Sequence, residues 1–342
     1  MGDAGQRKTL FMGVGALIVL WGIIGAFDMG NLTFSGYQTD GNNTITQVSS
    51  GSPAAAAGLQ VGDYIRSIGG VSMEDTKALI SQPRPEIGQE HVVVVERNGE
   101  PVEANLRYSA LPGTQKGATY GATLIGLCYL FFGLWAFSSA PSRSTKLLAL
   151  LGLLFAPAFI AGPYISSAAL RNLTGGIITT AIIIGFAVLL DFVTSYSSKQ
   201  PANKRLIYGP AALVALITLA FLVFQPASTS GLNIFFRVMF GLFIAGYFGL
   251  ALISIIRNFS RATADERTTD GLGLMLLGTL IGLLPVTISS IVGLVAPTVV
   301  LPGSQYYFLT LILIPITFAV AAIKSAQTES PSPAPVGGEF GA

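Results

Sequence analysis

The chain has 342 residues, of which 51% are hydrophobic and only 11% are charged, and its formal net charge is +2. Soluble domains carry about 25% charged residues, so the composition excludes an ordinary soluble globular protein. One Cys and one His exclude an internal disulfide and every motif that needs two His or a Cys/His cluster. The weak positive charge gives no reason to expect nucleic acid as a partner.

Eight apolar segments are long enough to be membrane helices, which need about 20 largely apolar residues. They are Leu10–Phe27, Thr119–Phe137, Leu147–Ile165, Gly175–Val193, Leu206–Phe224, Phe235–Ile256, Leu272–Ala296 and Tyr307–Ile323. The expected fold class is therefore a multispan α-helical membrane protein with eight transmembrane helices. A globular α+β insert lies between the first and second spans.

The Lys and Arg residues between the spans predict the orientation, because short cytoplasmic loops are enriched in them. With the N-terminus inside, eleven basic residues fall in inner segments, against three (Lys116, Arg171 and Arg237) in the outer flanks. We expect a multi-pass protein of a bacterial plasma (inner) membrane with both termini in the cytoplasm. The first span is expected to remain as an uncleaved anchor, since Gly25-Ala26-Phe27-Asp28 is a poor signal-peptidase site.

The chain divides into four expected segments. Residues 1–30 form the cytoplasmic N-terminus and the anchor helix, and residues 31–110 form an extracytoplasmic domain. Residues 111–324 form a seven-helix bundle. Residues 325–342 form a Ser/Pro/Gly-rich tail, a composition typical of disorder.

Only residues 31–110 have an ordinary globular composition over a long stretch. Strand-like patterns occur at Thr44–Val48, Tyr64–Ile68, His91–Glu96 and Val102–Tyr108, with Asn98-Gly99 as a hairpin turn. A helix is expected over Ser72–Ser81, where Ser72 would be the N-cap and two acidic residues would lie in the first turn.

A series of motifs in this insert carries a family resemblance. The string Gly51-Ser52-Pro53-Ala54-Ala55-Ala56-Ala57-Gly58-Leu59 is followed by Val61-Gly62-Asp63-Tyr64-Ile65, then Ile68-Gly69-Gly70-Val71 and Val93-Val94-Val95-Glu96-Arg97-Asn98-Gly99. In order and spacing they resemble the PDZ domain of bacterial HtrA-like proteases. The resemblance implies that the insert captures a protein C-terminus or an extended segment by strand addition beside a helix.

The same resemblance implies where a peptide would bind. The carboxylate-binding loop would be Phe34-Ser35-Gly36-Tyr37, where Gly36 lets neighbouring N–H groups converge on one anion. The groove face of the helix would include Thr76, Leu79 and Ile80. Alternatively, Leu79 and Ile80 belong to the core, and Phe34 anchors the domain at the membrane interface.

One span, an external PDZ domain and seven more spans also resemble the input half of bacterial sensor histidine kinases of the competence type. Asp265-Glu266-Arg267, Gly282-Leu283-Leu284-Pro285 and Ile314-Pro315-Ile316-Thr317-Phe318-Ala319 carry this resemblance. Those kinases continue with a phosphorylatable His and an ATP-binding domain. Here only residues 325–342 follow the last span and the one His lies in the insert, so we expect no kinase activity from this chain alone.

The sequence lacks the residues that other classes of membrane enzyme need. Site-2-type metalloproteases need two His and a Glu around zinc, and rhomboid-type proteases need a membrane Ser with a His. Intramembrane aspartyl proteases need two facing Asp; Asp191 is the one acid inside a span, and Asp270 lies at the edge of another. We therefore expect no enzyme activity and no cofactor or metal. Acids within membranes usually have a partner or water access, so Asp191 is either solvated at the interface or bonded to an inner basic residue.

Three functional hypotheses remain. The first is a receptor-like or scaffold protein whose external PDZ domain captures a peptide while the bundle transmits the event or holds a protein partner in the membrane or cytoplasm. The second is an adaptor for membrane-protein assembly or quality control, without signalling. The third, a transporter, is disfavoured because paired broken helices with several polar midplane residues are missing from the sequence pattern.

Overall fold

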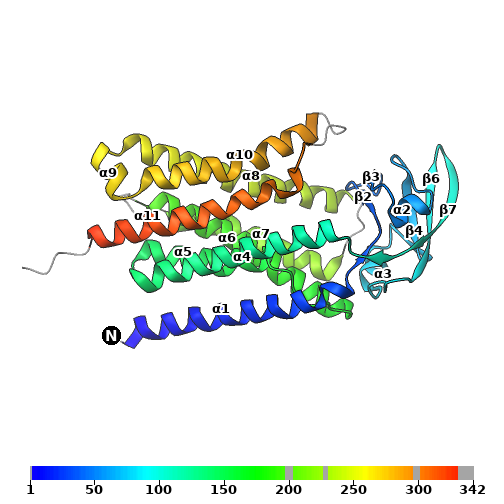
Figure 1. Cartoon of the computed structure of the whole chain (residues 1–342), viewed down its shortest axis with the longest axis horizontal. Coiled ribbons are helices and arrows are strands. Elements are labelled where there is room, and N and C mark those ends of the chain that lie inside the picture. Colours follow the sequence, from blue (N-terminus) through cyan, green and yellow to red (C-terminus); the bar gives the residue numbers. More distant parts are fainter. Residues whose placement is uncertain (1, 197–202, 226–229, 296–300, 330–342) are drawn as a thin grey trace, which may run out of the picture.

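The computed structural model describes residues 2–196, 203–225, 230–295 and 301–329. Long helices run side by side, and a smaller β-rich unit covers one end of them (Figure 1). The helices outside the β-rich unit are α1 (Gly2–Asp28), the short 3-10 helix η1 (Met29–Asn31), α4 (Gly113–Ser139), α5 (Arg143–Phe159), α6 (Ala168–Ser195), α7 (Lys204–Phe224), α8 (Gly231–Arg261), α9 (Ala264–Thr269), α10 (Leu272–Val295), the 3-10 helix η2 (Ser304–Ile312) and α11 (Leu313–Glu329).

Within the described residues, seven helical segments are long and apolar enough to cross a membrane. They are Gly5–Asn31, Gly113–Ser139, Ala168–Ser195, Lys204–Phe224, Gly231–Arg261, Leu272–Ser289 and Tyr306–Thr328. The expected helix over Leu147–Ile165 is wrong at its C-terminal end, because α5 has 17 residues and ends at Phe159. The sequence Gly162-Pro163 explains this end, since the residue before a proline disfavours the helical conformation.

The non-helical segment after α5 is packed inside the protein. The Ala161 N–H donates to Thr123 Oγ1 at 3.3 Å, and the Tyr164 N–H donates to Asp28 Oδ2 at 2.9 Å. Gly25 of α1 lies so close to this segment that a Cβ there would overlap the Ala161 carbonyl. Protein neighbours thus satisfy backbone groups that a bilayer would leave without partners.

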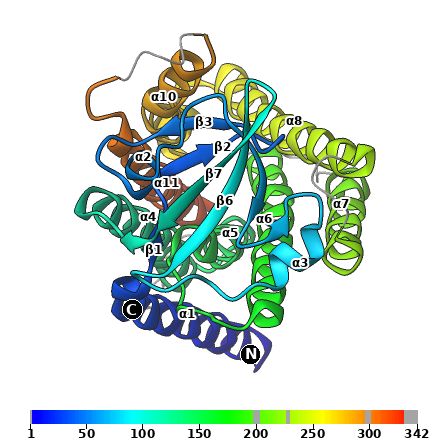
Figure 2. The same cartoon turned by 90° about the vertical axis from the view of Figure 1, so that its right-hand side faces the viewer.

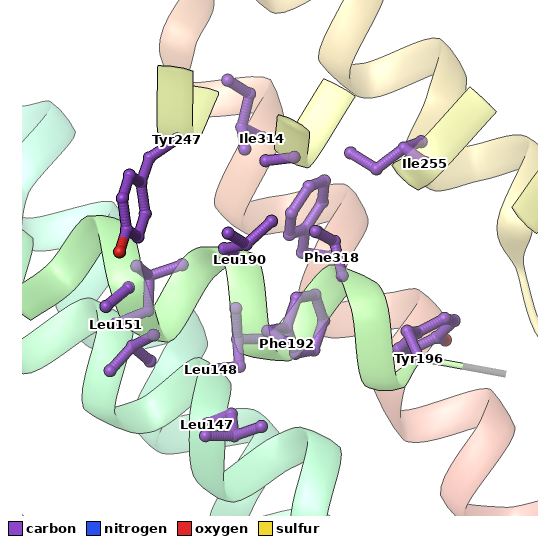
Figure 3. Close-up of a cluster of buried hydrophobic side chains, with 14 of the residues drawn as sticks. Leu147, Leu148, Leu151, Leu190, Phe192, Tyr196, Tyr247, Ile255, Ile314 and Phe318 are labelled. Atoms are coloured by element: carbon purple, nitrogen blue, oxygen red, sulfur yellow. The ribbon is translucent and has the colours of Figure 1, made fainter. Parts of the chain in front are cut away.

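The bundle core is formed by side chains from several helices that are distant in sequence (Figure 3). The rings of Phe192 on α6 and Phe318 on α11 stack with centroids 5.6 Å apart. Leu148 and Leu151 of α5 are 2% and 1% exposed, so this short helix is deeply buried. Helix α11 continues to Glu329, so residues 325–329 of the expected tail are helical. Residues 330–342, and Ala296 of an expected span, lie outside the described residues.

The β-rich unit contains three small sheets and two short helices in its described part, which is continuous. The strands are β1 (Thr33–Phe34), β2 (Tyr37–Thr39), β3 (Ile45–Val48), β4 (Tyr64–Ile68), β5 (Val71–Ser72), β6 (Glu90–Arg97), β7 (Glu100–Arg107) and β8 (Ser109–Ala110); the helices are α2 (Pro53–Ala56) and α3 (Thr76–Ser81). The largest sheet has the strand order β5-β4-β6-β7, β2 pairs with β3, and β1 pairs with β8. The unit has its own core, formed by Ile45, Ala54, Leu59, Ile65, Val93, Val95, Ala104 and Leu106.

The four expected strands and the hairpin turn are confirmed to within two residues at each end. Asn98 and Gly99 have φ angles of +55° and +85°, as a two-residue type I′ turn requires. The expected cap is wrong. Ser72 belongs to β5, and Asp75 caps α3 by accepting a hydrogen bond from the Ala78 N–H at 2.9 Å.

Candidate peptide-binding site and buried polar cluster

The predicted carboxylate-binding loop, Phe34–Tyr37, joins β1 to β2. Its carbonyl groups accept hydrogen bonds from the start of α2 and from its N-cap. The Ser35 carbonyl accepts the Ala54 N–H at 2.9 Å, and the Gly36 carbonyl accepts the Ser52 hydroxyl at 3.3 Å. Gly36 is buried with φ +88°, and a Cβ there would overlap Ser52. The loop carbonyls thus point towards α2, and Gly36 is required by both its conformation and its packing.

Hydrogen-bond direction shows which backbone groups of this loop face outwards. The Ser49 N–H donates to the Gly36 carbonyl at 2.8 Å, and Tyr37 lies opposite Val48. This pattern makes Tyr37 and Val48 a non-hydrogen-bonded pair, so the Tyr37 N–H points away from β3. In the described part of the chain, β3 is the one strand that pairs with β2, which leaves the other edge of β2 open for an added strand.

The three predicted groove residues on α3 have different surroundings. The Thr76 hydroxyl is buried and has no hydrogen-bond partner among the described residues. Leu79 and Ile80 are partly buried and lie outside the core cluster of the β-rich unit, to which Met73 and Ile68 contribute instead. Helix α3 packs on β5 and on α6 of the bundle. Whether these residues and the loop bind one peptide remains a prediction.

Helix α3 lies beside α6 of the membrane bundle (Figure 2) and is attached to it through its C-terminal carbonyl groups. The Arg171 guanidinium, in the first turn of α6, donates to the Ile80 carbonyl at 3.0 Å and to the Gln82 carbonyl at 2.9 Å. The last carbonyls of a helix have no partner within it, so one cation satisfies two of them. Nothing in the sequence around Arg171 predicted this contact with a residue about 90 positions away.

Three further contacts attach the β-rich unit to the bundle. Strands β1 and β8 pair where the chain leaves α1 and returns to α4. Arg237 of α8 donates to the Gly41 carbonyl at 2.7 Å. The Arg84 guanidinium lies 5.5 Å from the centre of the Tyr164 ring. Burial and the nearby Arg171 charge lower the pKa of Arg84 from its usual value.

Asp63 and Arg97 form a buried ion pair inside the β-rich unit. Arg97 Nε donates to Asp63 Oδ1 and Arg97 Nη2 donates to Asp63 Oδ2, both at 2.8 Å. The hydrogen bonds from Arg97 hold the pKa of Asp63 below its usual value. Because Arg97 also donates to the Gly58 carbonyl at 2.8 Å, its hydrogen bonds connect three of the four motifs on which the family resemblance rests.

Asp191 lies in a buried polar cluster at the end of the bundle remote from the β-rich unit. Its carboxylate accepts hydrogen bonds from Arg143 at 3.0 Å, Ser195 at 2.9 Å and Tyr208 at 3.1 Å. The side chain is 3% exposed, so solvation at the interface does not account for it, and the alternative of a bond to a basic residue, here Arg143, does. Ser195 could have been found from its i, i+4 spacing on the same helix. Arg143 and Tyr208 required the fold.

The side chains that could bind zinc are dispersed in the described part of the chain. Zinc sites use three or four protein ligands drawn from Cys, His, Asp and Glu. In the described residues no three such side chains lie close enough together to hold a metal ion. The one His, His91, faces Gln89 and Tyr108, and the one Cys, Cys128, lies in α4.

Comparison with known proteins gives two matches. The family model of the PDZ domain matches residues 44–87. The chain contains a PDZ domain. Among curated proteins, the zinc metalloprotease RasP of Shouchella clausii (strain KSM-K16) is 29% identical over 149 residues, which cover 41% of this chain and 35% of that protein. No solved structure matches.

The PDZ domain and the long apolar helices indicate a multi-pass membrane protein that binds a peptide or protein. The PDZ match begins at residue 44, so the predicted loop at 34–37 lies outside it and the predicted groove residues of α3 lie within it. The chain spans about a third of the length of the RasP relative. Neither match confirms the resemblance to sensor histidine kinases.

Proposed function

We propose that this protein is a membrane-anchored receptor or scaffold whose PDZ domain captures a protein C-terminus or an extended segment. The observation that carries the proposal is the attachment of α3 to the bundle through Arg171. Helix α3, which the family resemblance assigns to the groove, is also the helix that contacts α6, so a peptide bound beside α3 would act directly on the membrane bundle. A PDZ domain attached by a flexible linker would not have this property.

The proposed binding mode is strand addition at the open edge of β2. The N–H groups of the loop at residues 34–37 take the peptide carboxylate, and the Tyr37 N–H, which points away from β3, begins the ladder with the peptide. The buried Thr76 hydroxyl, which has no partner among the described residues, takes a polar group of the peptide, and Leu79 takes an apolar side chain. Burial raises the pKa of Tyr37 to about 12, because its side chain packs against the core of the β-rich unit.

We expect the PDZ domain outside the cell and both termini in the cytoplasm. The N-terminus and the C-terminal end of α11 lie at the end of the bundle opposite the PDZ domain (Figure 1). Most basic residues outside the PDZ domain lie in the segments that this topology places in the cytoplasm, as is usual for membrane proteins. After Cys128→Ser, a cysteine at position 40 should react with an impermeant maleimide in intact cells, and one at position 335 should react only after lysis. The reverse labelling pattern would refute this topology.

The full-length protein should bind apolar C-terminal peptides with micromolar affinity, about −8 kcal/mol. An amidated peptide should bind about tenfold more weakly, because charge-assisted bonds from the loop N–H groups are lost. Thr76→Val should weaken binding by a few-fold without destabilising the protein, since it removes a buried hydroxyl that has no partner among the described residues. Isothermal titration in detergent measures all three affinities.

Thr46→Val is the control, because Thr46 is exposed on β3 and its hydroxyl donates to the Gln38 carbonyl on the side of β2 that faces β3, away from the open edge. Equal affinity for the acid and the amide would exclude the loop at 34–37 as the carboxylate site.

Binding of the same peptide also distinguishes a receptor from an adaptor. Spin-label distances between the far ends of α6 and α11 should change on binding in a receptor, and stay constant in an adaptor that only holds a partner.

The second candidate is a non-catalytic adaptor for membrane-protein assembly or quality control. Two observations favour it. The chain is similar to RasP, a zinc metalloprotease, and yet it has a single His, whereas a metalloprotease motif needs two. In that function the PDZ domain selects a membrane protein and a separate partner acts on it. We propose that this chain has no proteolytic or kinase activity of its own, and a transporter is the least supported function.

A further inference from the structure

A basic pocket of about 370 Å³ is lined by residues of α1, the end of α4, the connection to α5 and the first turn of α5: Arg7, Lys8, Phe137, Pro141, Ser142, Arg143 and Lys146. The start of α1 and the connection between α4 and α5 lie at the end of the bundle opposite the PDZ domain (Figure 1). Of these seven residues, four carry a positive charge and none carries a negative one. Such a concentration of like charge favours binding of an anion.

The cations of this pocket are only partly neutralised within the described chain. Arg143 forms the ion pair with Asp191. The ammonium groups of Lys8 and Lys146 form no hydrogen bond or ion pair with any residue in the described ranges. Ser142 caps α5, so the positive end of that helix adds to the same potential.

An apolar surface begins directly beside these charges. Phe137 forms one wall of the pocket, and its ring lies 5.5 Å from that of Phe11, one turn along α1 from Arg7. Leu10 and Leu17 of α1 are 62% and 66% exposed, as expected for a lipid-facing helix. The pocket is therefore at the boundary between charged groups and hydrocarbon, where a phospholipid headgroup lies.

A second cavity, of about 300 Å³ and almost entirely apolar, lies further along α1. Val14, Leu17, Ile18 and Trp21 of α1 line it, together with Pro157 of α5 and residues of α6. It begins six residues after Lys8, which is about 9 Å along a helix. An acyl chain attached to a headgroup in the basic pocket reaches this depth.

We propose that the basic pocket binds the phosphate group of an anionic phospholipid from the leaflet on that side of the membrane. Lys8 and Lys146 contact the phosphate, Phe137 and Pro141 cover the glycerol region, and one acyl chain lies along α1. A free phosphate ion could present the same phosphate group to the pocket, but unlike the phospholipid it has no acyl chain. The bound lipid holds α1 against α5, and α1 is the helix that leads into the PDZ domain.

The test uses the purified full chain and phosphatidylglycerol, with phosphatidylcholine of the same acyl chains as the zwitterionic comparison. Native mass spectrometry should show preferential retention of phosphatidylglycerol. Lys8→Ala/Lys146→Ala should weaken this binding about thirtyfold, at about 1 kcal/mol for each lysine. Lys8→Arg/Lys146→Arg keeps both charges and should retain the lipid.

Lys204→Ala/Lys324→Ala is the matched control, because it removes two exposed lysines at the same end of the bundle but outside the pocket. It should change binding by less than threefold. Unchanged phosphatidylglycerol binding in Lys8→Ala/Lys146→Ala, or an equal loss in the control, would overturn the proposal. Inorganic phosphate that competes at the same concentration as the lipid would show that free phosphate is the ligand and would overturn the lipid assignment.

Discussion

Arg97→Ala should lower the free energy of unfolding of the PDZ domain by about 3–5 kcal/mol, the usual effect of removing one partner of a buried ion pair. Asp63 is 2% exposed and would keep only the Gln60 N–H, at 2.8 Å, as a donor to its carboxylate. Small domains have a total stability of about 5–15 kcal/mol. Urea unfolding of residues 31–110, followed by circular dichroism, measures the loss. The fragment is expected to fold because its core cluster is its own.

Arg66→Ala is the matched control within the same sheet. Arg66 pairs with Glu96, but its side chain is 59% exposed, so its removal should cost less than about 1 kcal/mol. A loss for Arg97→Ala no larger than for Arg66→Ala would contradict the buried pair. Both variants remove one guanidinium that is paired with a carboxylate, so they change the charge equally. A difference between their losses in stability therefore measures the effect of burying the pair.

The effect of Arg97→Ala should also depend on pH. The hydrogen bonds from Arg97 lower the pKa of Asp63 in the folded state below its unfolded value of about 3.9. The pair therefore stabilises the domain fully above the unfolded pKa, and this stabilisation disappears as the pH falls through the lower folded pKa. The difference between wild type and Arg97→Ala should be largest near pH 7 and shrink below about pH 4.

The sequence predicted the four longest PDZ strands, β3, β4, β6 and β7, because their signals are local. Val93 and Val95 alternate with more exposed neighbours on β6, and Asn98-Gly99 is a turn with a specific backbone requirement. The pairing of β1 with β8 could not be predicted. Thr33 and Ala110 lie 77 positions apart in strands of two residues, too short to show a periodic pattern. Their pairing depends on where α1 and α4 leave the bundle.

The existence of the long apolar helices could be predicted from the sequence, but their exact ends and their contacts with one another could not. Long apolar runs gave the helices, but the apolar run at residues 147–165 continues past the end of α5, and only the local Gly162-Pro163 sequence marked that end. The partners of Asp191 show the same limit. An acid in a span implies a partner, but Arg143 and Tyr208 come from two other helices and are 48 and 17 positions away.

Arg143→Ala should destabilise the protein more than Asp191→Ala, although both remove the same ion pair. Arg143→Ala leaves a carboxylate with 3% exposure and two hydroxyl donors, whereas Asp191→Ala leaves a guanidinium that is 47% exposed and can be solvated. We expect losses of about 3 kcal/mol and about 1–2 kcal/mol, the first at the low end for buried pairs because Arg143 is half exposed. Thermal unfolding in detergent should show a fall in Tm of about 6–12 °C for Arg143→Ala.

The double variant Arg143→Ala/Asp191→Ala should be close to Asp191→Ala alone, because removing the carboxylate also removes the unpaired charge. Arg261→Ala, an exposed arginine at the end of α8, controls for loss of positive charge on that side. These variants also decide the role of the cluster. If Asp191→Ala abolishes cleavage of a membrane substrate while the fold persists, Asp191 is catalytic and the adaptor and receptor proposals both fail. If Asp191→Ala lowers only Tm, the cluster joins α5, α6 and α7, as its hydrogen bonds to Arg143 and Tyr208 indicate.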